Sequence, residues 1–358
     1  MVKRLILTIN PGSTSTKLAL FEEDKMVFEK NIQHTAEEIS KFARVADQFE
    51  YRKKIILNEL AIRKVNLPSI NAVVGRGGVI KPIESGVYSV NEKMKEDLKS
   101  GKYGEHSSNL GGLIAEDIAL SLPNAKAFIV DPVVVDELEP VARISGHPKI
   151  ERKSIFHALN HKAVTRIYSD SISRKYEDLN LIVAHMGGGI SVAAHRKGKV
   201  VDVNNALDGD GPFSPERSGG LPAGQLVNIC FSGDYSLSEV KLMLTGKGGM
   251  VAYLGTNSFE KICKMAQAGN TKAQLIKETV AYQVGKEIGS MAAVLKGEVN
   301  AIILTGGMAF NKQHVDSIKS MISFIAEVVV YPGEDEMKAL ASNGLLALNN
   351  KIKIKTYI

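Results

Sequence analysis

The sequence predicts an α/β protein in which one structural unit occurs twice, and three observations lead to this prediction. Near the N-terminus an apolar run breaks into glycine and hydroxyl residues and then resumes, which is typical of a β-hairpin with a ligand-binding turn. The same layout returns about half a chain length later. Further apolar runs end in glycine or charged residues, as strands do at the ligand-binding edge of an α/β sheet.

The first hairpin is expected from strands at Leu5–Ile9 and Leu18–Phe21. In the turn between them Gly12 leaves room for a ligand to approach the backbone, and Ser13 and Ser15 are expected on one face of an extended chain. Their hydroxyl groups can donate to phosphate oxygens. The spacing is not that of a P-loop, and an ordinary Gly/Ser turn is the alternative interpretation.

The second hairpin is expected from Leu181–Met186 and Ile190–Ala194, which flank the triple glycine Gly187–Gly189. The agreement continues beyond the hairpin, because a charged turn and a third apolar run follow in each copy, Met26–Glu29 in the first and Val200–Val203 in the second. One glycine turn can arise by chance, whereas two in the same context indicate duplicated domains that face each other across a cleft.

Three more strands are expected to end in polar or glycine residues: Ala72–Val74 before Gly75-Arg76, Ala127–Val130 before Asp131, and Ala301–Thr305 before Gly306. In α/β sheets ligands bind beyond the carboxyl ends of the strands. Together with the two hairpin turns, these strand ends are therefore candidates for one shared site.

Length and composition agree with two domains. At 358 residues, 44% of them hydrophobic and 23% charged, the chain exceeds the size at which one globular core usually keeps growing. We expect a first domain over residues 1–150 and a second over 151–333, with a C-terminal helix at about 334–358 that packs back on the first. Helical spacing of apolar residues predicts helices over 35–65 and Thr271–Leu295.

The charge pattern argues against a nucleic-acid partner. The formal net charge is +6, but the lysines are scattered and no basic run is interleaved with aromatic residues. We interpret Arg52-Lys53-Lys54 as solvated surface. Cys230 and Cys263 have no paired spacing, which suggests a reducing compartment and no zinc site. No apolar segment has membrane length, so we expect a cytoplasmic protein without a membrane partner.

Taken together, the motifs resemble those of the acetokinase family in the actin-like ATPase superfamily, over essentially the whole chain. The matching segments are Asn10–Lys17, Phe156–Lys162, His185–Gly189, Asp208–Gly219 and Thr305–Ala309. The resemblance implies an α/β fold of two duplicated actin-like ATPase domains, ribonuclease H-like, with a cleft between them. It also implies that the acyl substrate binds on the first domain, that the nucleotide binds mainly on the second, and that the cofactors are ATP and Mg²⁺.

Two segments depart from acetate kinases and are similar to the butyrate branch of the family. Gly75-Arg76-Gly77-Gly78 stands in place of a His-Gly-Gly stretch, and Pro215–Gly219 in place of a Gly-Thr-Arg-Cys-Gly turn. The implied reaction is reversible phosphoryl transfer from ATP to butanoate, which gives butanoyl phosphate and ADP. The acceptor carboxylate is ionised at neutral pH, so the protein must supply positive charge and alignment, and a general base is not required.

Four residues are expected to serve the transfer itself. The resemblance assigns Arg217 to the phosphoryl oxygens or the substrate carboxylate, Arg76 to the substrate carboxylate, His157 to a hydrogen bond with the phosphoryl group in flight, and Asp131 to holding magnesium or orienting ligands. Three of them have structural alternatives: a surface pair of Arg217 with Glu216, a structural histidine after a strand-like apolar dipeptide, and an Asp-Pro turn.

The resemblance assigns the remaining site residues to three groups. The phosphates and the nucleotide are expected at Asn10, Gly12, Ser13, Ser15 and Lys17 in the first turn, at His185, Gly187, Gly188 and Gly189 in the second, and at Gly306, Gly307 and Met308. The acyl substrate is expected at His106 and Asn109, besides Arg76. Magnesium is expected at Asn10, Asp131 and Glu336, or at Asp335 in place of Glu336. A helix N-terminal turn that complements the dipole is the other interpretation of this acidic pair.

Several alternatives remain open. Acetate, propionate and isobutyrate compete with butanoate as substrate, because one methylene changes discrimination by only about 1–3 kcal/mol. A non-catalytic actin-like ATP-binding switch would not need two arginines for a second anion. A sugar or glycerol kinase on the same fold would need a general-base carboxylate. Relatives in the family are at least dimeric, so a homo-oligomer is expected by resemblance.

Overall fold

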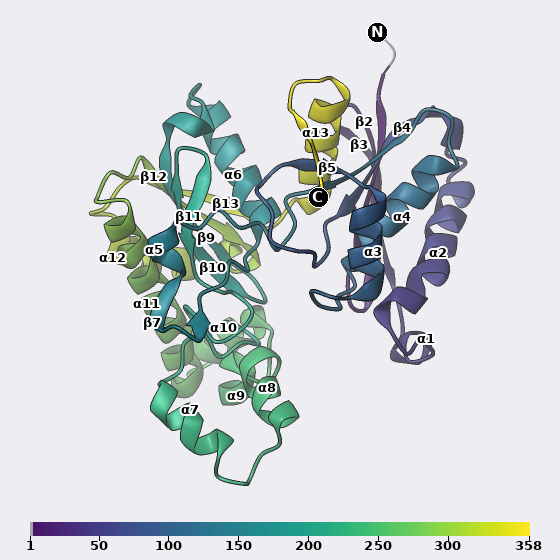
Figure 1. Ribbon diagram of the computed structural model, residues 1–358. Helices are drawn as coiled ribbons and strands as arrows, with labels where there is room; N and C mark the ends of the chain where they lie inside the picture. Colours follow the sequence, from purple (N-terminus) through teal and green to yellow (C-terminus); the bar gives the residue numbers. More distant parts are fainter. Residues whose placement is uncertain (1–2) are drawn as a thin grey trace. The chain divides into compact units, whose positions relative to one another are not determined.

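The structure is a computed structural model that describes residues 3–358, and these residues form two compact units (Figure 1). Unit 1 contains the described chain up to Val135 together with Asp335–Ile358, and unit 2 contains Asp136–Glu334. The boundary between the two units lies between Val135 and Asp136, earlier in the chain than the expected boundary at residue 150. One reason is a backbone contact inside unit 2, where Glu139 N–H donates to Val201 O at 3.0 Å.

Among the described residues, unit 1 is built on a seven-stranded sheet. In spatial order its strands are β14 (Ile354–Thr356), β5 (Val87–Ser89), β6 (Lys126–Val130), β4 (Ile70–Arg76), β1 (Leu5–Pro11), β2 (Ser15–Glu22) and β3 (Lys25–Gln33). β1, β2 and β3 form an antiparallel meander, while β4 runs parallel to β1 and β6 parallel to β4. The predicted first hairpin and the strands that precede Gly75 and Asp131 are therefore confirmed.

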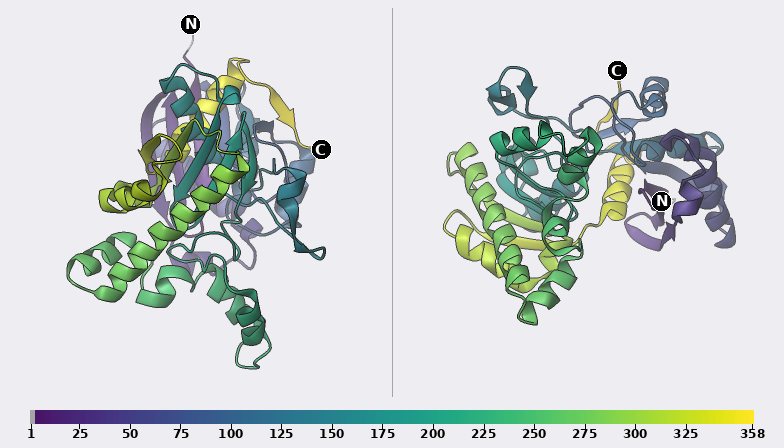
Figure 2. Two further views of the ribbon diagram at one scale, coloured as in Figure 1. Left: turned by 90° about the vertical axis from the view of Figure 1, so that its left-hand side faces the viewer. Right: turned by 90° about the horizontal axis from the view of Figure 1, so that it is seen from below.

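The helices of unit 1 are α1 (Ala36–Ile39), α2 (Phe49–Ile62), α3 (Glu92–Ser100), α4 (Asn109–Leu120) and α13 (Glu336–Leu348). α4 packs directly on β4, and this contact requires glycine, because a Cβ at Gly75 would lie 2.2 Å from Gly111 O. From the far end of the chain, α13 returns to unit 1 and packs on β1 and β4 (Figure 2). A Cβ at Gly344 in this helix would lie 2.7 Å from Val74 Cγ2.

The helix expected over 35–65 is interrupted. It is divided into α1 and α2 by an irregular segment and a short 3₁₀ helix at Val45–Gln48. Tertiary contacts of Arg44 explain the interruption, because its side chain donates to Glu105 at 2.8 Å and to Ser100 O at 3.0 Å, at and beyond the end of α3. The apolar periodicity is real, but contacts with α3 override it over these residues.

Unit 2 repeats the layout of unit 1. In the described residues its main sheet has five strands, in the order β11 (Lys199–Val203), β10 (Ile190–Arg196), β9 (Asn180–Met186), β12 (Ala301–Gly306) and β13 (Val328–Pro332). β9, β10 and β11 form an antiparallel meander and β12 runs parallel to β9, as β1 to β4 do in unit 1. The predicted duplication is therefore confirmed in strand order.

Helices cover both faces of the unit 2 sheet (Figure 1). Alternate residues of β9 face opposite ways: Leu181 and Val183 pack in one apolar cluster with α6 (Ala158–Ser171), and Ile182 and Ala184 pack in another with α11 (Thr271–Val294). α11 confirms the helix predicted over 271–295. The other elements are α5 (Pro140–Arg143), β7 (Ile144–His147), β8 (Ile150–Glu151), α7 (Ala223–Cys230), α8 (Leu237–Thr245), α9 (Gly249–Leu254), α10 (Phe259–Gln267) and α12 (Lys312–Ile322). Within residues 3–358 no helix is long and apolar enough to cross a lipid bilayer.

Candidate active site

Three polar side chains meet at the carboxyl end of the unit 1 sheet. Arg76, the last residue of β4, places its Nη1 atom 3.1 Å from Glu336 Oε1 at the start of α13. Asn10 in β1 donates through Nδ2 to Glu336 Oε2 at 2.5 Å. Arg76 Nη1 also lies 3.4 Å from Asn10 Oδ1. A guanidinium, an amide and a carboxylate thus form one cluster, which we call the polar cluster of unit 1.

The structure distinguishes the roles of Asp335 and Glu336, the two neighbouring acidic residues considered for magnesium. Asp335 is the N-cap of α13, and its side chain accepts from Lys338 N–H at 3.1 Å. Glu336 contacts Asn10 and Arg76 instead. Asp335 therefore caps the helix and complements its dipole, whereas Glu336 belongs to the polar cluster.

Asp131 follows β6 in a left-handed backbone conformation with a φ of 37°. The Oδ1 atom of its carboxylate accepts hydrogen bonds from the Ser85 hydroxyl and from Gly86 N–H, both at 2.7 Å. These contacts join the end of β6 to the segment before β5, which is the structural role expected of an Asp-Pro turn. A non-glycine residue in this conformation costs about 1–3 kcal/mol, and such residues cluster at functional sites. Asp131 therefore combines a structural role with a strained backbone position at the carboxyl end of β6.

The first turn departs from the expected extended conformation. Ser13 lies in a bend and β2 begins only at Ser15, so the alternation of an extended strand does not apply between these two hydroxyls. Gly12 N–H closes the turn by donating to Ser15 O at 2.8 Å. Lys17 lies directly opposite Asn10 in the hairpin register. The Lys17 backbone therefore faces Asn10, while its Nζ atom lies 3.8 Å from Glu29 Oε1 in β3.

Arg52 packs against this turn from α2. Its Nη1 atom donates to the carbonyls of Gly12 at 2.9 Å and Ser15 at 2.8 Å, and to the Thr16 hydroxyl at 3.0 Å. Its Nη2 atom donates to Ser13 O at 3.3 Å. The guanidinium thereby gives the carbonyl groups of Gly12 and Ser13 a buried donor and adds a second donor to Ser15 O, which also accepts from Gly12 N–H. These contacts hold the turn in one conformation.

The interpretation of Arg52 as solvated surface is wrong, because its exposed fraction is 0%. It lies on the buried stripe of α2 together with Ile56 and Leu60. This four-residue spacing is a signal that could have identified Arg52 from the sequence. Burial lowers the pKa of the Arg52 guanidinium from its ordinary value, and the group stays charged.

The two residues assigned to the acyl substrate lie at the start of α4. Asn109 is buried, and its Oδ1 atom accepts from Val79 N–H at 2.7 Å while its Nδ2 atom donates to Gly104 O at 2.9 Å. Both ends of the amide are therefore used by the backbone, which favours a positioning role for Asn109. His106 Nδ1 lies 2.8 Å from the Ser108 hydroxyl, a contact that fixes the orientation of the ring.

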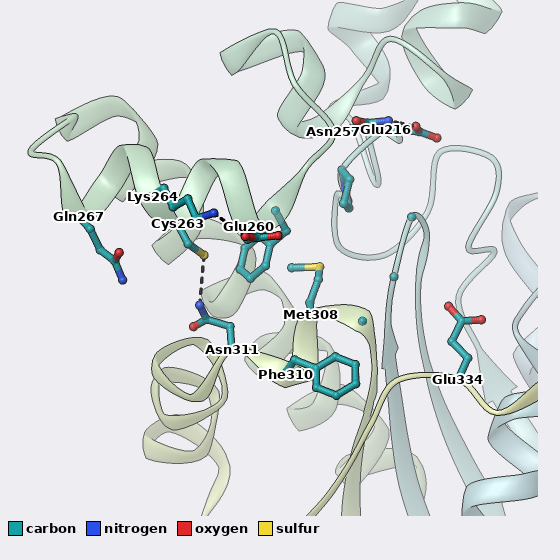
Figure 3. A pocket seen from close by; sticks show the side chains of 15 residues that line it. Glu216, Asn257, Glu260, Cys263, Lys264, Gln267, Met308, Phe310, Asn311 and Glu334 are labelled. Atoms are coloured by element: carbon teal, nitrogen blue, oxygen red, sulfur yellow. Dashed lines mark hydrogen bonds and ion pairs between the residues drawn. The ribbon is translucent and has the colours of Figure 1, made fainter.

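Unit 2 contains a pocket of about 690 Å³ at the carboxyl ends of β9 and β12 (Figure 3). Gly187 and Gly188 line it from the turn between β9 and β10, and Gly307 and Met308 line it from the turn after β12. Small-molecule sites have volumes of roughly 300–1,000 Å³. Two glycine turns that are more than a hundred residues apart, and that the sequence analysis assigned to one nucleotide, therefore border one pocket of suitable size.

Conformation and packing distinguish the glycines of this pocket. Gly306 has a φ of 89°, and a Cβ there would lie 2.4 Å from Met186 O, so glycine is needed for the close approach of β12 and β9. At Gly188, by contrast, a Cβ would meet nothing within 4 Å among the described residues. The fold itself does not need glycine at this position. Because Gly188 has no side chain, it leaves space for a ligand beside the backbone.

Other pocket side chains were missed by the sequence analysis because they follow no motif spacing. Phe259 and Cys263 come from α10, Asn311 precedes α12, and Asn257 comes from the loop before α10. Asn311 Nδ2 donates to Cys263 Sγ at 3.3 Å and so joins the two helices (Figure 3). Phe259 and Met308 give this part of the pocket an apolar wall of the kind that suits a planar base.

Arg217 packs on the triple glycine. A Cβ at Gly189 would lie 2.0 Å from Arg217 Nη1, so only glycine admits the guanidinium at this position. Arg217 Nη1 donates to Ala206 O at 2.5 Å, and burial lowers the pKa of the guanidinium, which stays charged. Glu216 accepts a hydrogen bond from Asn257 at 2.5 Å. The alternative of an exposed pair between Arg217 and Glu216 therefore does not describe this arginine.

His157 and His185 stack face to face, with ring centroids 3.8 Å apart. His157 is the N-cap of α6, and the chain before it is irregular, so the strand-like interpretation of the preceding dipeptide is wrong. His185 Nδ1 lies 2.9 Å from Asn160 Oδ1, and its Nε2 atom lies 3.6 Å from Glu334 Oε1. No pattern in the sequence singled out Asn160 or Glu334, although Asn160 is one helical turn from His157.

The resemblance implies a magnesium ion, and the side chains present show whether one could bind. No group of three or more His, Cys, Asp or Glu side chains in residues 3–358 could hold a metal ion. Mg²⁺ needs no such group, because it usually binds one or two carboxylates together with water and substrate phosphates. Glu336 beside Asn10 offers a carboxylate and an amide of this kind. These residues fit Mg²⁺ in the presence of phosphates, and the ion would compete with Arg76 for Glu336.

Solved structures of carboxylate kinases resemble the chain over most of its length. The crystal structure of Porphyromonas gingivalis acetate kinase has a TM-score of 0.80 at 18% identity and covers 97% of this chain and 100% of its own. A propionate kinase from Francisella tularensis subsp. tularensis SCHU S4 has a TM-score of 0.74 at 18% identity, with 95% and 98% covered. Entamoeba histolytica acetate kinase has a TM-score of 0.74 at 17% identity, with 94% and 97% covered. These likenesses confirm the predicted fold class, two actin-like ATPase domains.

The family follows from the sequence of unit 2. The model of the acetokinase family matches residues 147–333, slightly more than half of the 358-residue chain. The matched region contains His157, Arg217 and both glycine turns of the unit 2 pocket. The chain therefore belongs to the acetokinase family and is an ATP-dependent carboxylate kinase.

Proposed function

We propose that this kinase transfers the γ-phosphoryl group of MgATP to butanoate and so forms butanoyl phosphate and ADP. A carboxylate oxygen attacks the γ-phosphorus in line with the leaving group, the bond to the β,γ-bridging oxygen breaks, and its electron pair stays on ADP. No proton is removed from the acceptor, because a carboxylic acid has a pKa of about 4.3, as a Glu side chain does. The protein's task is therefore to align two anions and offset their repulsion.

The main support for this proposal is the position of Arg217 on Gly189, beside the two glycines that line the pocket. Arg217 is half-buried, and a partly shielded guanidinium interacts with a phosphoryl group more strongly than a fully exposed one does. We assign Arg217 and His157 to the transferred phosphoryl group, and Gly187–Gly189 with His185 to the β-phosphate. The turn Gly306–Met308 would then lie against adenosine and ribose. A nucleotide-binding switch without a second substrate would not need this half-buried cation.

We assign the acceptor carboxylate and the metal to unit 1. Arg76 can bind a carboxylate through two parallel N–H groups, with His106 as a further substrate residue. Glu336 and Asn10 would hold Mg²⁺, which neutralises charge on the β- and γ-phosphates when it is bound. We assign Asp131 to orienting ligands and not to proton abstraction, since its Oδ1 atom already accepts two hydrogen bonds. The first turn, with Gly12, Ser13, Ser15 and Lys17, would contact phosphate oxygens.

Butanoate is proposed because Gly75–Gly78 and Pro215–Gly219 follow the pattern of the butyrate branch. The test is acyl phosphate formation, trapped with hydroxylamine, from acetate, propionate, butyrate, isobutyrate and valerate at fixed MgATP. We expect kcat/KM to be highest for the four-carbon acids. It should be at least about 30-fold higher than for acetate, which lacks two methylenes worth about 1–3 kcal/mol each.

The same assay contains the outcomes that would contradict the proposal. A maximum at acetate or propionate would retain the reaction and exclude butanoate as the preferred acid. If none of the acids gave a hydroxamate while ATP still bound, the assignment of a carboxylate acceptor to this site would be wrong. ATP hydrolysis measured without any acid is the control, because it reports phosphoryl transfer to water and not to a carboxylate.

The cysteines support a cytoplasmic location as part of this proposal. Both are free thiols, Cys230 exposed and Cys263 buried. Exposed free thiols persist in reducing compartments.

We also propose that the protein forms a homo-oligomer through α7 and α8, which carry exposed apolar side chains. Phe231, just after α7, is 86% exposed, and Leu237 at the start of α8 is 72% exposed. None of the residues of α7 is buried. Monomeric proteins rarely leave a contiguous apolar patch in water, and such patches mark interaction sites.

Sedimentation equilibrium is expected to show at least a dimer for the natural sequence and a monomer for the double variant Phe231→Ser, Leu237→Ser. Leu120 in α4, 74% exposed, supplies the matched control, because Leu120→Ser removes an equally exposed leucine outside the proposed interface. A monomeric natural protein, or a double variant that stays associated, would show that these helices are not the interface.

A further inference from the structure

Five side chains of unit 2 form a continuous series of hydrogen bonds that leads from His157 into the interior. Ser191 Oγ lies 2.9 Å from His157 Nδ1 and 2.9 Å from His161 Nε2. His161 Nδ1 lies 3.2 Å from His195 Nε2, and His195 Nδ1 lies 2.6 Å from the Tyr176 hydroxyl. We call these five residues the histidine relay.

The inner histidines of the relay are buried and neutral. His161 and His195 both have an exposed fraction of 0%. Burial lowers the pKa of each ring well below its ordinary value, and the nearby charge of Lys162 lowers both further. Lys162 itself is held in place by Glu137 at 2.7 Å. Each inner ring therefore carries one N–H group and one acceptor nitrogen.

With neutral rings, two arrangements of protons pair every donor of the relay with an acceptor of the relay. In the first, Tyr176 donates to His195, each member donates to the next, and Ser191 finally donates to His157 Nδ1, so that His157 carries its proton on Nε2. In the second, every hydrogen bond is reversed, and His157 donates from Nδ1 and keeps a lone pair on Nε2. If only the link between Ser191 and His157 reversed, both rings would donate to Ser191 Oγ, and the hydroxyl proton would have no acceptor within the relay.

We propose that Tyr176 selects the first arrangement and thereby keeps the proton of His157 on Nε2, ready for donation to an anionic phosphoryl group. This inference rests on the proposed function, because it takes His157 as a donor to the transferred group. A phenol is a stronger acid than a neutral imidazole N–H, and an imidazole nitrogen is a better acceptor than a phenol oxygen. The contact between Tyr176 and His195 therefore favours donation from tyrosine.

The direction of hydrogen-bond donation along the relay matters because the phosphoryl group that His157 would contact is an anion. An N–H group on Nε2 would stabilise charge that develops on the phosphoryl oxygens, whereas a lone pair there would repel it. Tyr176 is thus a positioning residue that acts on His157 through three intervening side chains. It lies in a short 3₁₀ helix, Tyr176–Asp178, between α6 and β9, and no sequence motif connects it with His157.

The first test needs no substrate. Two-bond ¹H–¹⁵N NMR correlations report which nitrogen of a histidine carries the proton, and His157→Gln, His161→Gln and His195→Gln variants assign the signals. In the natural protein all three rings are expected to show the Nε2–H tautomer. A proton on Nδ1 of any of the three would overturn the proposal. This result does not depend on which acid the enzyme phosphorylates.

The second test measures the transfer. Tyr176→Phe removes the group that sets the direction, and kcat is expected to fall about 10-fold while the KM values change by less than about twofold. Tyr168→Phe is the matched control, because Tyr168 packs in the same apolar cluster and is not a member of the relay. Its kcat is expected to change by less than about twofold. In a His157→Ala background, Tyr176→Phe is expected to have no further effect.

The outcomes separate the relay from the proposed function. Equal losses in the two tyrosine variants, or a full loss from Tyr176→Phe when His157 is already alanine, would show that Tyr176 acts by packing alone and would overturn the relay. If the natural protein showed Nε2–H at all three histidines but formed acyl phosphate from no acid, the proposed function would fail. The proton order itself would then still be supported.

Discussion

Arg217→Ala is expected to lower kcat for acyl phosphate formation by about 10²–10³-fold, which corresponds to about 2.7–4 kcal/mol of lost transition-state stabilisation. Arg217 lies on Gly189 beside the glycines that line the pocket, and its charge is partly shielded from water. Arg217 is expected to contact the phosphoryl oxygens most closely in the transition state, when the group lies between the attacking and leaving oxygens, and ADP lacks that group. The affinity for ADP, measured by calorimetry, is therefore expected to change by less than about threefold.

A second arginine of unit 2 provides the control. Arg196 in β10 pairs with Glu139 and donates to Val294 O at 2.7 Å. Arg196→Ala removes the same charge from the same unit outside the pocket, and its kcat is expected to stay within about twofold of the natural value. If Arg217→Ala retained transfer within a few-fold, the proposed mechanism would be wrong. An equal loss in ADP affinity would mean that Arg217 binds the ground state and does not act selectively on the transfer.

Arg52→Met is expected to destabilise unit 1 by about 3–5 kcal/mol, because the carbonyl groups of Gly12, Ser13 and Ser15 would lose their buried donor. Methionine retains much of the apolar bulk, so the loss reports mainly on the hydrogen bonds. The measurement is urea unfolding followed by far-UV circular dichroism, since the chain has no tryptophan. Amide hydrogen exchange in β1 and β2 is expected to speed up in parallel, because the turn that joins them would lose its support.

Lys54→Met is the matched control, since Lys54 is an exposed neighbour on the same helix. Its effect on the free energy of unfolding is expected to stay within about 0.5 kcal/mol. Equal stability of Arg52→Met and the natural protein would contradict the structural role of Arg52. If the protein lost stability while amide hydrogen exchange in β1 and β2 stayed unchanged, Arg52 would stabilise unit 1 through contacts other than those with the first turn.

Much of this fold could be predicted because its evidence is local. Each hairpin is an apolar run, a glycine turn and a second apolar run, and the second copy at Gly187–Gly189 repeats the first in the same context. Strand ends at Arg76 and Gly306 are visible where an apolar run stops. These patterns reflect backbone preferences and side-chain alternation, which act between residues close in sequence. For the same reason Gly306 and Met308 could be assigned to a turn without knowledge of what faces it.

The sequence by itself therefore determined the duplicated α/β architecture, the two glycine turns and the family. Tertiary structure alone decided the roles that depend on distant partners. Arg52 belongs to a basic run in the sequence, yet it is buried, because its helix brings it beneath the carbonyl groups of the first turn. Asn109 resembles a ligand residue, yet the backbone engages both ends of its amide. Tyr176 and His195 meet only after folding, because a hydrogen bond requires an approach of about 3 Å between atoms that sequence spacing does not constrain.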